Sequence, residues 1–390
     1  MRYSKKSAIT WGLTALLCLQ LSAVSAAAQP VENSGAPAAA KPLAAASSKA
    51  EQEVQAYYEH VVEYPKLDAA WVAWARQHNA AVGAGEYAGF LWRADSEDAA
   101  RLPRNFRTCQ SPYTKAVKGK FTAFMNKDTA PTRQGLDTLR ISGSAEMSYK
   151  EFQAAVEQLR KLTTGPIYDV DLRQESHGYF DGQAVSWYGL RDWGNADKKD
   201  DRKAILRDEQ QRLQAAGENS AGLVVARITE QAEAPKIVRK PVVQTEEEVA
   251  KSLGIRYFRI TARDHLWPAP QYIDQFLRFY RGLPKDAWLH FHCEAGAGRT
   301  TAYMVMVDIL NNPELPLADI LQRQYMIGGN YAAYTIKNPK AGSWKAPFYA
   351  EKARMLPVFY AYVQENKATG FAVPWSKWLA SHPAAGTASI

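Results

Sequence analysis

The chain has 390 residues, of which 46% are hydrophobic and 23% are charged, and its formal net charge is +8. This length and apolar content allow one large folded domain with a smaller one, and they exclude a disordered chain. The cationic residues are spread along the sequence and do not form one basic block, so the excess suits an anionic ligand and predicts no nucleic-acid partner.

The amino terminus predicts export. Residues 1–26 begin with cations, continue with a short apolar stretch and end in small residues at Ala26, which is the pattern of a cleaved secretory signal peptide. A membrane anchor and a lipid attached at Cys18 are the competing interpretations. The first needs a longer apolar stretch, and the second usually needs a smaller residue than Leu17. We therefore expect a periplasmic or secreted protein without stable membrane association.

The next segment differs from the rest in composition. Residues 27–50 are rich in Ala, Pro and Ser and hold almost no large apolar residue, so they predict a linker. Beyond it we expect a first part of the main domain at 51–196, a small β-rich unit at about 197–243, the second part of the main domain at 244–375 and a tail at 376–390.

Helix and strand signals alternate through the main domain. Ser148 with Glu151 forms a capping box, as does Thr245 with Glu248, and each predicts the start of a helix. Pro270 predicts the start of another. Apolar stretches predict strands at 167–172, 223–228, 236–243, 255–260 and 287–291, and a buried helix at 301–310. This alternation indicates an α/β sandwich with a largely parallel central sheet.

The segment between the last strand and the last of these helices is the most informative part of the sequence. Here Cys293 and Arg299 are separated by five residues, two of them glycines, and Thr300 follows. At a strand-to-helix turn, free backbone N–H groups and the helix dipole attract an oxyanion, and glycines let those groups converge on it. Arg299 offers a planar fork for two phosphate oxygens. The same field would stabilise a nucleophilic Cys293 thiolate.

The other residues of this segment complete a phosphate-binding loop. We expect Thr300 to donate its hydroxyl to the thiolate and His292 to orient the loop from behind. A cysteine six positions before an arginine is a common coincidence, but the glycines and the strand–loop–helix context favour the functional interpretation. The loop residues that would surround the phosphate are Glu294, Ala295, Gly296, Ala297 and Gly298.

The ten residues from His292 to Thr301 resemble the active-site loop of the cysteine-dependent phosphatases, and most of all that of the protein-tyrosine-phosphatase-like phytases. The likeness continues in 105–107, in 171–178 and in 264–268, and it covers much of the chain after about Leu102. It implies a phosphatase fold with a small inserted β-barrel, for which 197–243 is the approximate place. It also implies hydrolysis of myo-inositol hexakisphosphate and lower inositol polyphosphates through a phosphocysteine, with no cofactor.

Thiolate attack on a phosphate monoester expels a poor leaving group unless an acid protonates it. Asp264 follows a predicted strand, and Trp267 with Pro268 would stiffen its loop. The resemblance implies that Asp264 is the general acid; the competing interpretation is an aspartate that caps a turn before the proline. His265 would reach a substrate phosphate or simply pack within the loop.

Several further residues match pocket positions of the family. Lys345, Tyr349 and Lys352 are spaced by four and three, so a helix over this segment would place them on nearly one face. Without the resemblance, a solvated helix face would explain such lysines equally well. The resemblance implies that they hold non-reacting phosphates, that Arg107 binds phosphate, and that Asp192 orients a basic neighbour or a hydroxyl.

The cysteines and histidines limit the other chemistry. Once the signal peptide is removed, Cys109 and Cys293 remain; a reversible protective disulfide between them is one interpretation, and a free, partly buried Cys109 is the other. The seven histidines are scattered without metal-ligand spacing, so we expect no metal.

The sequence therefore predicts an exported phosphatase of inositol polyphosphates, either a monomer or a homodimer. One alternative is a protein-tyrosine or dual-specificity phosphatase, which would use the same loop at the base of a deep aromatic slot. Another is a phosphate-binding module without activity. Binding alone needs neither the Cys293 thiolate nor the Asp264 acid, which counts against that alternative.

Overall fold

The computed structural model describes residues 91–96, 98–114, 121, 125, 130–189, 192–220, 222–228, 232–337 and 344–383. All of them belong to one unit, which spans residues 46–390. The predicted signal peptide at 1–26 and the predicted linker at 27–50 lie outside the described residues.

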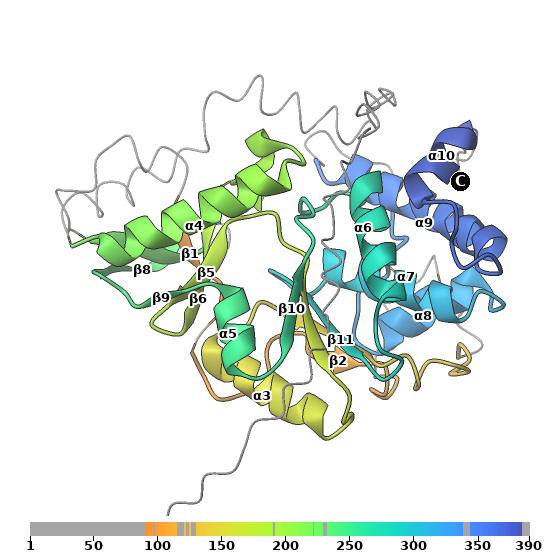
Figure 1. Cartoon of the computed structure of the whole chain (residues 1–390), viewed down its shortest axis with the longest axis horizontal. Coiled ribbons are helices and arrows are strands. Elements are labelled where there is room, and N and C mark those ends of the chain that lie inside the picture. The colour runs from red at the N-terminus through yellow and green to blue at the C-terminus, as the bar shows by residue number, and fades with distance from the viewer. Residues whose placement is uncertain are drawn as a thin grey trace, which may run out of the picture. The chain divides into compact units, whose positions relative to one another are not determined.

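The strands form two sheets, and strands of both can be followed in Figure 1. The strands are β1 (Leu91–Ala94), β2 (Arg107–Thr108), β3 (Ile141–Ala145), β4 (Ile167–Asp171), β5 (His177–Phe180), β6 (Gln183–Tyr188), β7 (Leu223–Ile228), β8 (Ala232–Val238), β9 (Val243–Gln244), β10 (Arg256–Arg259) and β11 (Trp288–Cys293). One sheet has the order β10-β4-β11-β3-β2, and the other has the order β8-β7-β1-β6-β5-β9.

The five-stranded sheet confirms the predicted parallel centre. Its strands β10, β4, β11 and β3 run parallel, and only the edge strand β2 is antiparallel. Strand β11 lies in the middle, and all six of its residues, His290 and His292 included, are buried as in a central parallel strand. The chain moves outward from β3 through β4 to β10 and then returns to β11. The carboxyl end of β11 therefore lies where the strand order reverses, the usual place of a ligand site in such sheets.

Helices connect and cover these strands. They are α3 (Tyr149–Arg160), η3 (Ala196–Lys198), α4 (Arg202–Glu218), α5 (Glu246–Ser252), α6 (Pro270–Arg281), α7 (Gly298–Asn311), α8 (Leu317–Met326), α9 (Ala346–Asn366) and α10 (Trp375–Ser381). Both predicted capping boxes are present, at the starts of α3 and α5. In Figure 1, α6 and α7 lie on one side of the five-stranded sheet and α3 and α5 on the other, as right-handed crossovers require.

Aromatic packing fixes α7 against the strand that precedes it. Phe276 of α6 contacts Phe291 of β11 and Tyr303 of α7 edge to face, with ring centroids 6.1 and 5.2 Å apart. All three side chains are fully buried. Because such interiors are close-packed and stiff, β11 and α7 form a rigid base for the loop between them.

The six-stranded sheet differs in part from the predicted small β unit. Strand β7 confirms the strand predicted at 223–228, but β8 and β9 replace the single strand predicted at 236–243, and the unpredicted helix α4 packs on this sheet through Leu213 and Ala216. The sheet also contains β1, β5 and β6, which lie outside 197–243. Its described strands form an open series from β8 to β9, so a closed barrel stays a prediction.

Among the described residues, no helix has the length and apolar character needed to span a membrane.

Candidate active site

The loop between β11 and α7 turns its carbonyl groups outward. The carbonyl of Glu294 accepts a hydrogen bond from the Glu146 N–H at 3.0 Å, that of Ala295 accepts one from the Asn105 amide at 2.8 Å, and that of Gly296 accepts one from Arg107 Nη1 at 2.8 Å. Because the C=O and the following N–H of a planar trans peptide point in opposite directions, the following N–H groups face the inside of the loop. The result is a ring of donors at the start of α7, which is an anion site.

Gly296 is the loop residue that has to be glycine. Its φ of +66° lies in the left-handed region, and a Cβ atom there would lie 2.3 Å from the backbone nitrogen of Ala145. Gly298, which the sequence also suggested for this reason, is different: the nearest atom to a Cβ there would be Lys352 Nζ at 3.9 Å. The loop therefore owes its close approach to β3 to Gly296 alone.

We expect Gly296→Ala to lower the free energy of unfolding by about 1–3 kcal/mol and to lower kcat/KM, because either the loop or β3 has to move. Gly298→Ala is the matched control and should stay close to the parent in the same chemical denaturation series. Equal stability of the two variants would contradict the assignment of the tight contact to Gly296.

Cys293 lies at the base of this ring. It ends β11, is buried, and receives a hydrogen bond from Thr300 Oγ1 at 3.1 Å. This is the contact that the sequence predicts for Thr300. Its polar surroundings and the donors above it are those that stabilise a thiolate.

Arg299 is held in place by a carboxylate that the sequence analysis did not single out. Its Nη1 and Nη2 atoms each donate to one oxygen of Glu175 at 2.8 Å, and Nη1 also donates to the carbonyls of Leu172 and Ala262 at 3.1 Å. Burial alone would raise the pKa of the Glu175 carboxyl, but Arg299 and Arg173 lower it well below its usual range. Glu175 is therefore an ionised, two-point clamp on the guanidinium.

Asp264 and His265 lie over the loop. Asp264 Oδ1 is 3.0 Å from Arg299 Nε, and its Oδ2 is 3.1 Å from His265 Nε2. Burial raises the pKa of Asp264, but the positive charge of Arg299 and the contact with His265 outweigh it, so the pKa lies below its usual value. Burial lowers the pKa of His265 to about 4. In this structure an ionised Asp264 thus lies beside the guanidinium that a phosphate would need.

Asp192 has the basic neighbour that the resemblance implied. Its carboxylate forms a short hydrogen bond with Arg93 Nη1, and Arg93 Nε donates to Asp95 at 2.6 Å. Burial raises the pKa of Asp192 to about 7, even though Arg93 opposes this and Asp264 adds to it. Arg93 lies in β1 and is buried; the sequence analysis missed it because a single arginine in a four-residue strand carries no spacing signal.

The helix predicted to carry Lys345, Tyr349 and Lys352 is present as α9. Lys345 precedes the first residue of the helix, and Lys352 is buried with its ammonium beside Gly298. Burial lowers the pKa of Lys352, while Asp264 and Cys293 raise it. Tyr349 lies between the two lysines, and its ring is 5.6 Å from Lys352 Nζ. The Lys352 ammonium therefore lies at the edge of the anion site, beside Gly298.

Arg107 lies under the loop and not in its opening. Besides the Gly296 carbonyl, its Nη1 donates to the Asn105 carbonyl and its Nη2 to Thr301 Oγ1, both at 3.0 Å. Burial lowers the pKa of Arg107 to about 10, still well above neutral, while Cys293 opposes the fall. These contacts are those of a residue that fixes the loop. At the outer edge of the loop, Glu294 pairs with Arg104 at 3.2 Å.

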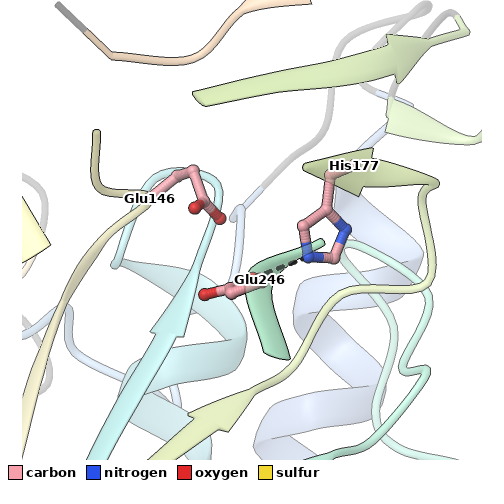
Figure 2. A group of neighbouring side chains, drawn as sticks. All are labelled: Glu146, His177 and Glu246. Atoms are coloured by element: carbon pink, nitrogen blue, oxygen red, sulfur yellow. Dashed lines mark hydrogen bonds and ion pairs between the residues drawn. The ribbon is translucent and has the colours of Figure 1, made fainter. Parts of the chain in front are cut away.

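His292 points away from the ring, into a buried group of carboxylates. Its Nε2 forms an ion pair with Glu246 at 2.8 Å and its Nδ1 one with Glu146 at 3.3 Å. Glu246 also accepts a hydrogen bond from His177 Nε2 at 2.8 Å. Figure 2 shows Glu146, His177 and Glu246 converging from the segment after β3, from β5 and from the start of α5. The histidine before the nucleophile thus connects the loop strand to the six-stranded sheet.

This buried network is ionic. Burial lowers the pKa of His177, but Asp171 outweighs it and raises the pKa to about 10; the carboxylates around His292 raise its pKa as well. The ligand-type atoms of Glu146, His177 and Glu246 lie within 4.8 Å of one another. The two ring nitrogens of His177 lie against the Glu175 carbonyl and the Glu246 carboxylate, at 2.7 and 2.8 Å, so the arrangement is one of paired charges.

The strand register excludes a disulfide between Cys109 and Cys293. Cys293 is paired with Ala145 at one end of β3, whereas the N–H of Cys109 donates to the carbonyl of Ile141 at the other end. Ile141 and Ala145 are four steps apart along the strand, which is about 13 Å. A disulfide needs Cα atoms within about 7 Å. Both cysteines are free and buried.

A buried cysteine at the end of a central parallel strand, a ring of loop amides and an arginine at the start of a buried helix together define the active-site architecture of the cysteine-dependent phosphatases. The comparisons agree with this class. The model of the PTP-like phytase family, whose description reads inositol hexakisphosphate, matches residues 170–311.

Solved structures and curated relatives support the same assignment. The chain is 48% identical to the PTP-like myo-inositol phosphatase of Mitsuokella multacida, solved in complex with myo-inositol-(1,3,4,5)-tetrakisphosphate, with a TM-score of 0.71 over 85% of this chain and 55% of that one. It is 29% identical to a PTP-like phytase from Bdellovibrio bacteriovorus, with a TM-score of 0.56 over 75% of this chain and 95% of that one. It is 27% identical to the effector protein hopD2 of Pseudomonas syringae pv. tomato, over 63% of this chain and 52% of that protein.

The family model and the solved structures support a protein-tyrosine-phosphatase-like phytase. It spans about half the length of the Mitsuokella and Pseudomonas proteins.

Proposed function

We propose that this protein is an exported phosphoric monoester hydrolase that removes phosphate from myo-inositol hexakisphosphate and lower inositol polyphosphates. The observation that carries the proposal is the hydrogen bond from Thr300 to Cys293 at the base of an amide ring that Arg299 borders. The family and the inositol phosphate complex of the Mitsuokella protein support the substrate class. Export rests on the signal-peptide pattern of residues 1–26.

In the first step, the Cys293 thiolate attacks phosphorus while the bond from phosphorus to the ring oxygen breaks. Asp264 gives its proton to that oxygen, so a neutral hydroxyl leaves. The amide ring and Arg299 stabilise the charge on the equatorial oxygens, and Glu175 keeps the guanidinium aimed at them without rearrangement during the reaction. Phosphate binding displaces Asp264 from Arg299, which raises the pKa of the acid when it is needed.

In the second step, a water molecule attacks the phosphocysteine and Asp264 takes a proton from it. The sulfur–phosphorus bond breaks, the Cys293 thiolate is restored and inorganic phosphate leaves. Thr300 donates to the sulfur and stabilises it as a leaving group. We assign Arg107 to this scheme as a positioning residue, since both of its terminal nitrogens donate to oxygens of the protein.

The test of substrate class is the rate of phosphate release from inositol hexakisphosphate compared with a phosphotyrosine peptide. The two lysines near the loop favour the inositol phosphate, because Lys345 and Lys352 can neutralise phosphates that do not react. A higher kcat/KM for the peptide would assign the protein to the tyrosine phosphatases.

The proposed contact of Lys352 with a substrate phosphate can be tested by mutation. Lys352→Met should raise the KM for inositol hexakisphosphate by about tenfold to a hundredfold, because one charge-assisted hydrogen bond is worth about 1.5–3 kcal/mol. An aryl monophosphate, which has no second phosphate, should lose less. The control is Lys377→Met on α10, which removes an exposed lysine of the same charge. Steady-state kinetics on both substrates check this, and an equal loss on both would place Lys352 at the reacting phosphate.

A further inference from the structure

Two carboxylates lie near the reacting position, and the mechanism above uses only one. One side-chain atom each of Asp192, Asp264 and His265 lies within 4.8 Å of the others. Asp192 has a φ of +62°, a backbone conformation that residues with a side chain rarely adopt. Its N–H donates to the Gly189 carbonyl at 2.9 Å, so a turn holds it in this conformation.

The segment that carries Asp192 is fastened to the loop that carries the acid. The indole N–H of Trp193 donates to the backbone carbonyl of Asp264 at 3.2 Å, and the Trp193 ring is buried and contacts the His265 ring edge to face. The separation of the two carboxylates is therefore set by the backbone as well as by their charges.

The charges around Asp192 come from every side. The groups that face it are Arg93 from β1, Asp264 and His265 from the segment after β10, Glu294 from the catalytic loop and Glu175 from the segment before β5. Arg93 is the only cation that hydrogen-bonds its carboxylate among the described residues, and it also pairs with Asp95. Two neighbouring buried carboxylates disfavour a second negative charge. The electrostatics therefore favour one shared proton, and Asp192 titrates close to neutral pH.

For Asp264, the surrounding charges favour the ionised form. Its contact with Arg299 keeps it ionised in the free protein, yet it has to be protonated when the leaving oxygen departs. A phosphate that binds to Arg299 removes this contact and adds negative charge, so Asp264 then needs a proton from a group that is already near. Asp192 is the carboxyl group in that place.

We propose that Asp192 is the proton partner of Asp264: the pair holds one proton, which moves from Asp192 to Asp264 when a substrate phosphate takes the place of Asp264 at Arg299. The inference rests on the proposed function. The O–H bond of Asp192 breaks as that of Asp264 forms, and the Asp264 proton then passes to the leaving ring oxygen. The water that hydrolyses the phosphocysteine returns one proton to the pair. Asp192 thus acts through Asp264.

The experiment measures kcat against pH for the parent, Asp192→Asn, Asp264→Asn and the double variant, on inositol hexakisphosphate and on an activated aryl phosphate. For Asp192→Asn we expect kcat on the inositol phosphate to fall about tenfold at neutral pH and the alkaline limb to move about one pH unit lower, because a negative neighbour no longer raises the pKa of Asp264. The aryl phosphate, whose leaving group needs no acid, should react at nearly the parental rate. The double variant should lose no more than Asp264→Asn alone.

Other results for the Asp192 and Asp264 variants would overturn the inference. An unchanged pH profile with a raised KM, or losses that multiply in the double variant, would make Asp192 a binding residue and overturn the inference. Asp181→Asn, at another positive φ and bonded to Val242, is the matched control and should keep the parental profile. If the parent itself turns over neither substrate, the proposed function fails instead.

A second measurement keeps the inference testable if Asp192→Asn does not fold. Carboxyl carbons labelled with ¹³C are titrated by NMR in Cys293→Ser, with and without inorganic phosphate. We expect a carboxyl that titrates near neutrality, and a second one whose pKa rises when phosphate is added. If every carboxyl titrates below about pH 5 in both samples, the pair does not share a proton.

Discussion

Replacing Cys293 with serine will abolish turnover while leaving the protein folded and able to bind inositol hexakisphosphate. The serine hydroxyl occupies nearly the same space, and Thr300 can still hydrogen-bond to it. A hydroxyl is far less acidic than a thiol, however, and among the described residues the side chain that hydrogen-bonds to this position is Thr300, which is not a base. We expect kcat to fall by about four orders of magnitude or more. Phosphate release at saturating substrate measures this.

The same variant separates covalent catalysis from simple binding. Rapid acid quenching of the parent with radiolabelled inositol phosphate should yield a phosphorylated protein, and Cys293→Ser should yield none. Cys109→Ser is the control because Cys109 lies about 13 Å away along β3 and should retain turnover. Residual activity in Cys293→Ser within about tenfold of the parent would show that sulfur is not the nucleophile.

The catalytic loop could be predicted because its function depends on neighbours in sequence. Cys293, Gly296 and Arg299 lie within one turn between a strand and a helix, so their spacing reports their geometry directly. The parallel sheet could be predicted for a similar reason, since capping boxes and apolar strands are local signals. The catalytic loop and the strand and helix signals can each be recognised within a short segment of sequence.

The supports of the site could not be predicted because they depend on pairs that are distant in sequence. Glu175 clamps Arg299 from 124 residues away, and Arg93 meets Asp192 from 99 residues away. The segment 171–178 did offer a signal, since Leu172 is its only large apolar residue and the segment is nonetheless entirely buried. Buried charges need partners, but a sequence does not say which ones.

The contacts of Arg107 are a further feature that the sequence could not predict. Its type and its family match predicted a phosphate ligand, yet the fold uses its guanidinium to hold the loop carbonyl of Gly296 and the hydroxyl of Thr301. An arginine can donate to a phosphate or to a carbonyl. Which of the two it meets depends on where the fold places β2 and the loop, and the sequence pattern does not carry that placement.

Asp264→Asn should lower kcat on inositol hexakisphosphate by about two to four orders of magnitude, and much less on an activated aryl phosphate. The asparagine keeps the shape: its amide oxygen can still accept from Arg299 and its amide NH2 can donate to His265, but it cannot give a proton to the ring oxygen. An aryl oxygen with electron-withdrawing groups leaves without one. The ratio of the two losses therefore isolates proton donation from binding.

Two further comparisons complete the test. Asp274→Asn on α6, whose carboxylate accepts from the Ser376 N–H, should leave both rates unchanged. The alkaline limb of the pH profile for the inositol phosphate should disappear in Asp264→Asn, because it reports the ionisation of the acid in the complex. Equal losses on both substrates would instead mean that Asp264 acts through Arg299, by holding the guanidinium, and the acid would have to be sought in the neighbouring carboxyl of Asp192.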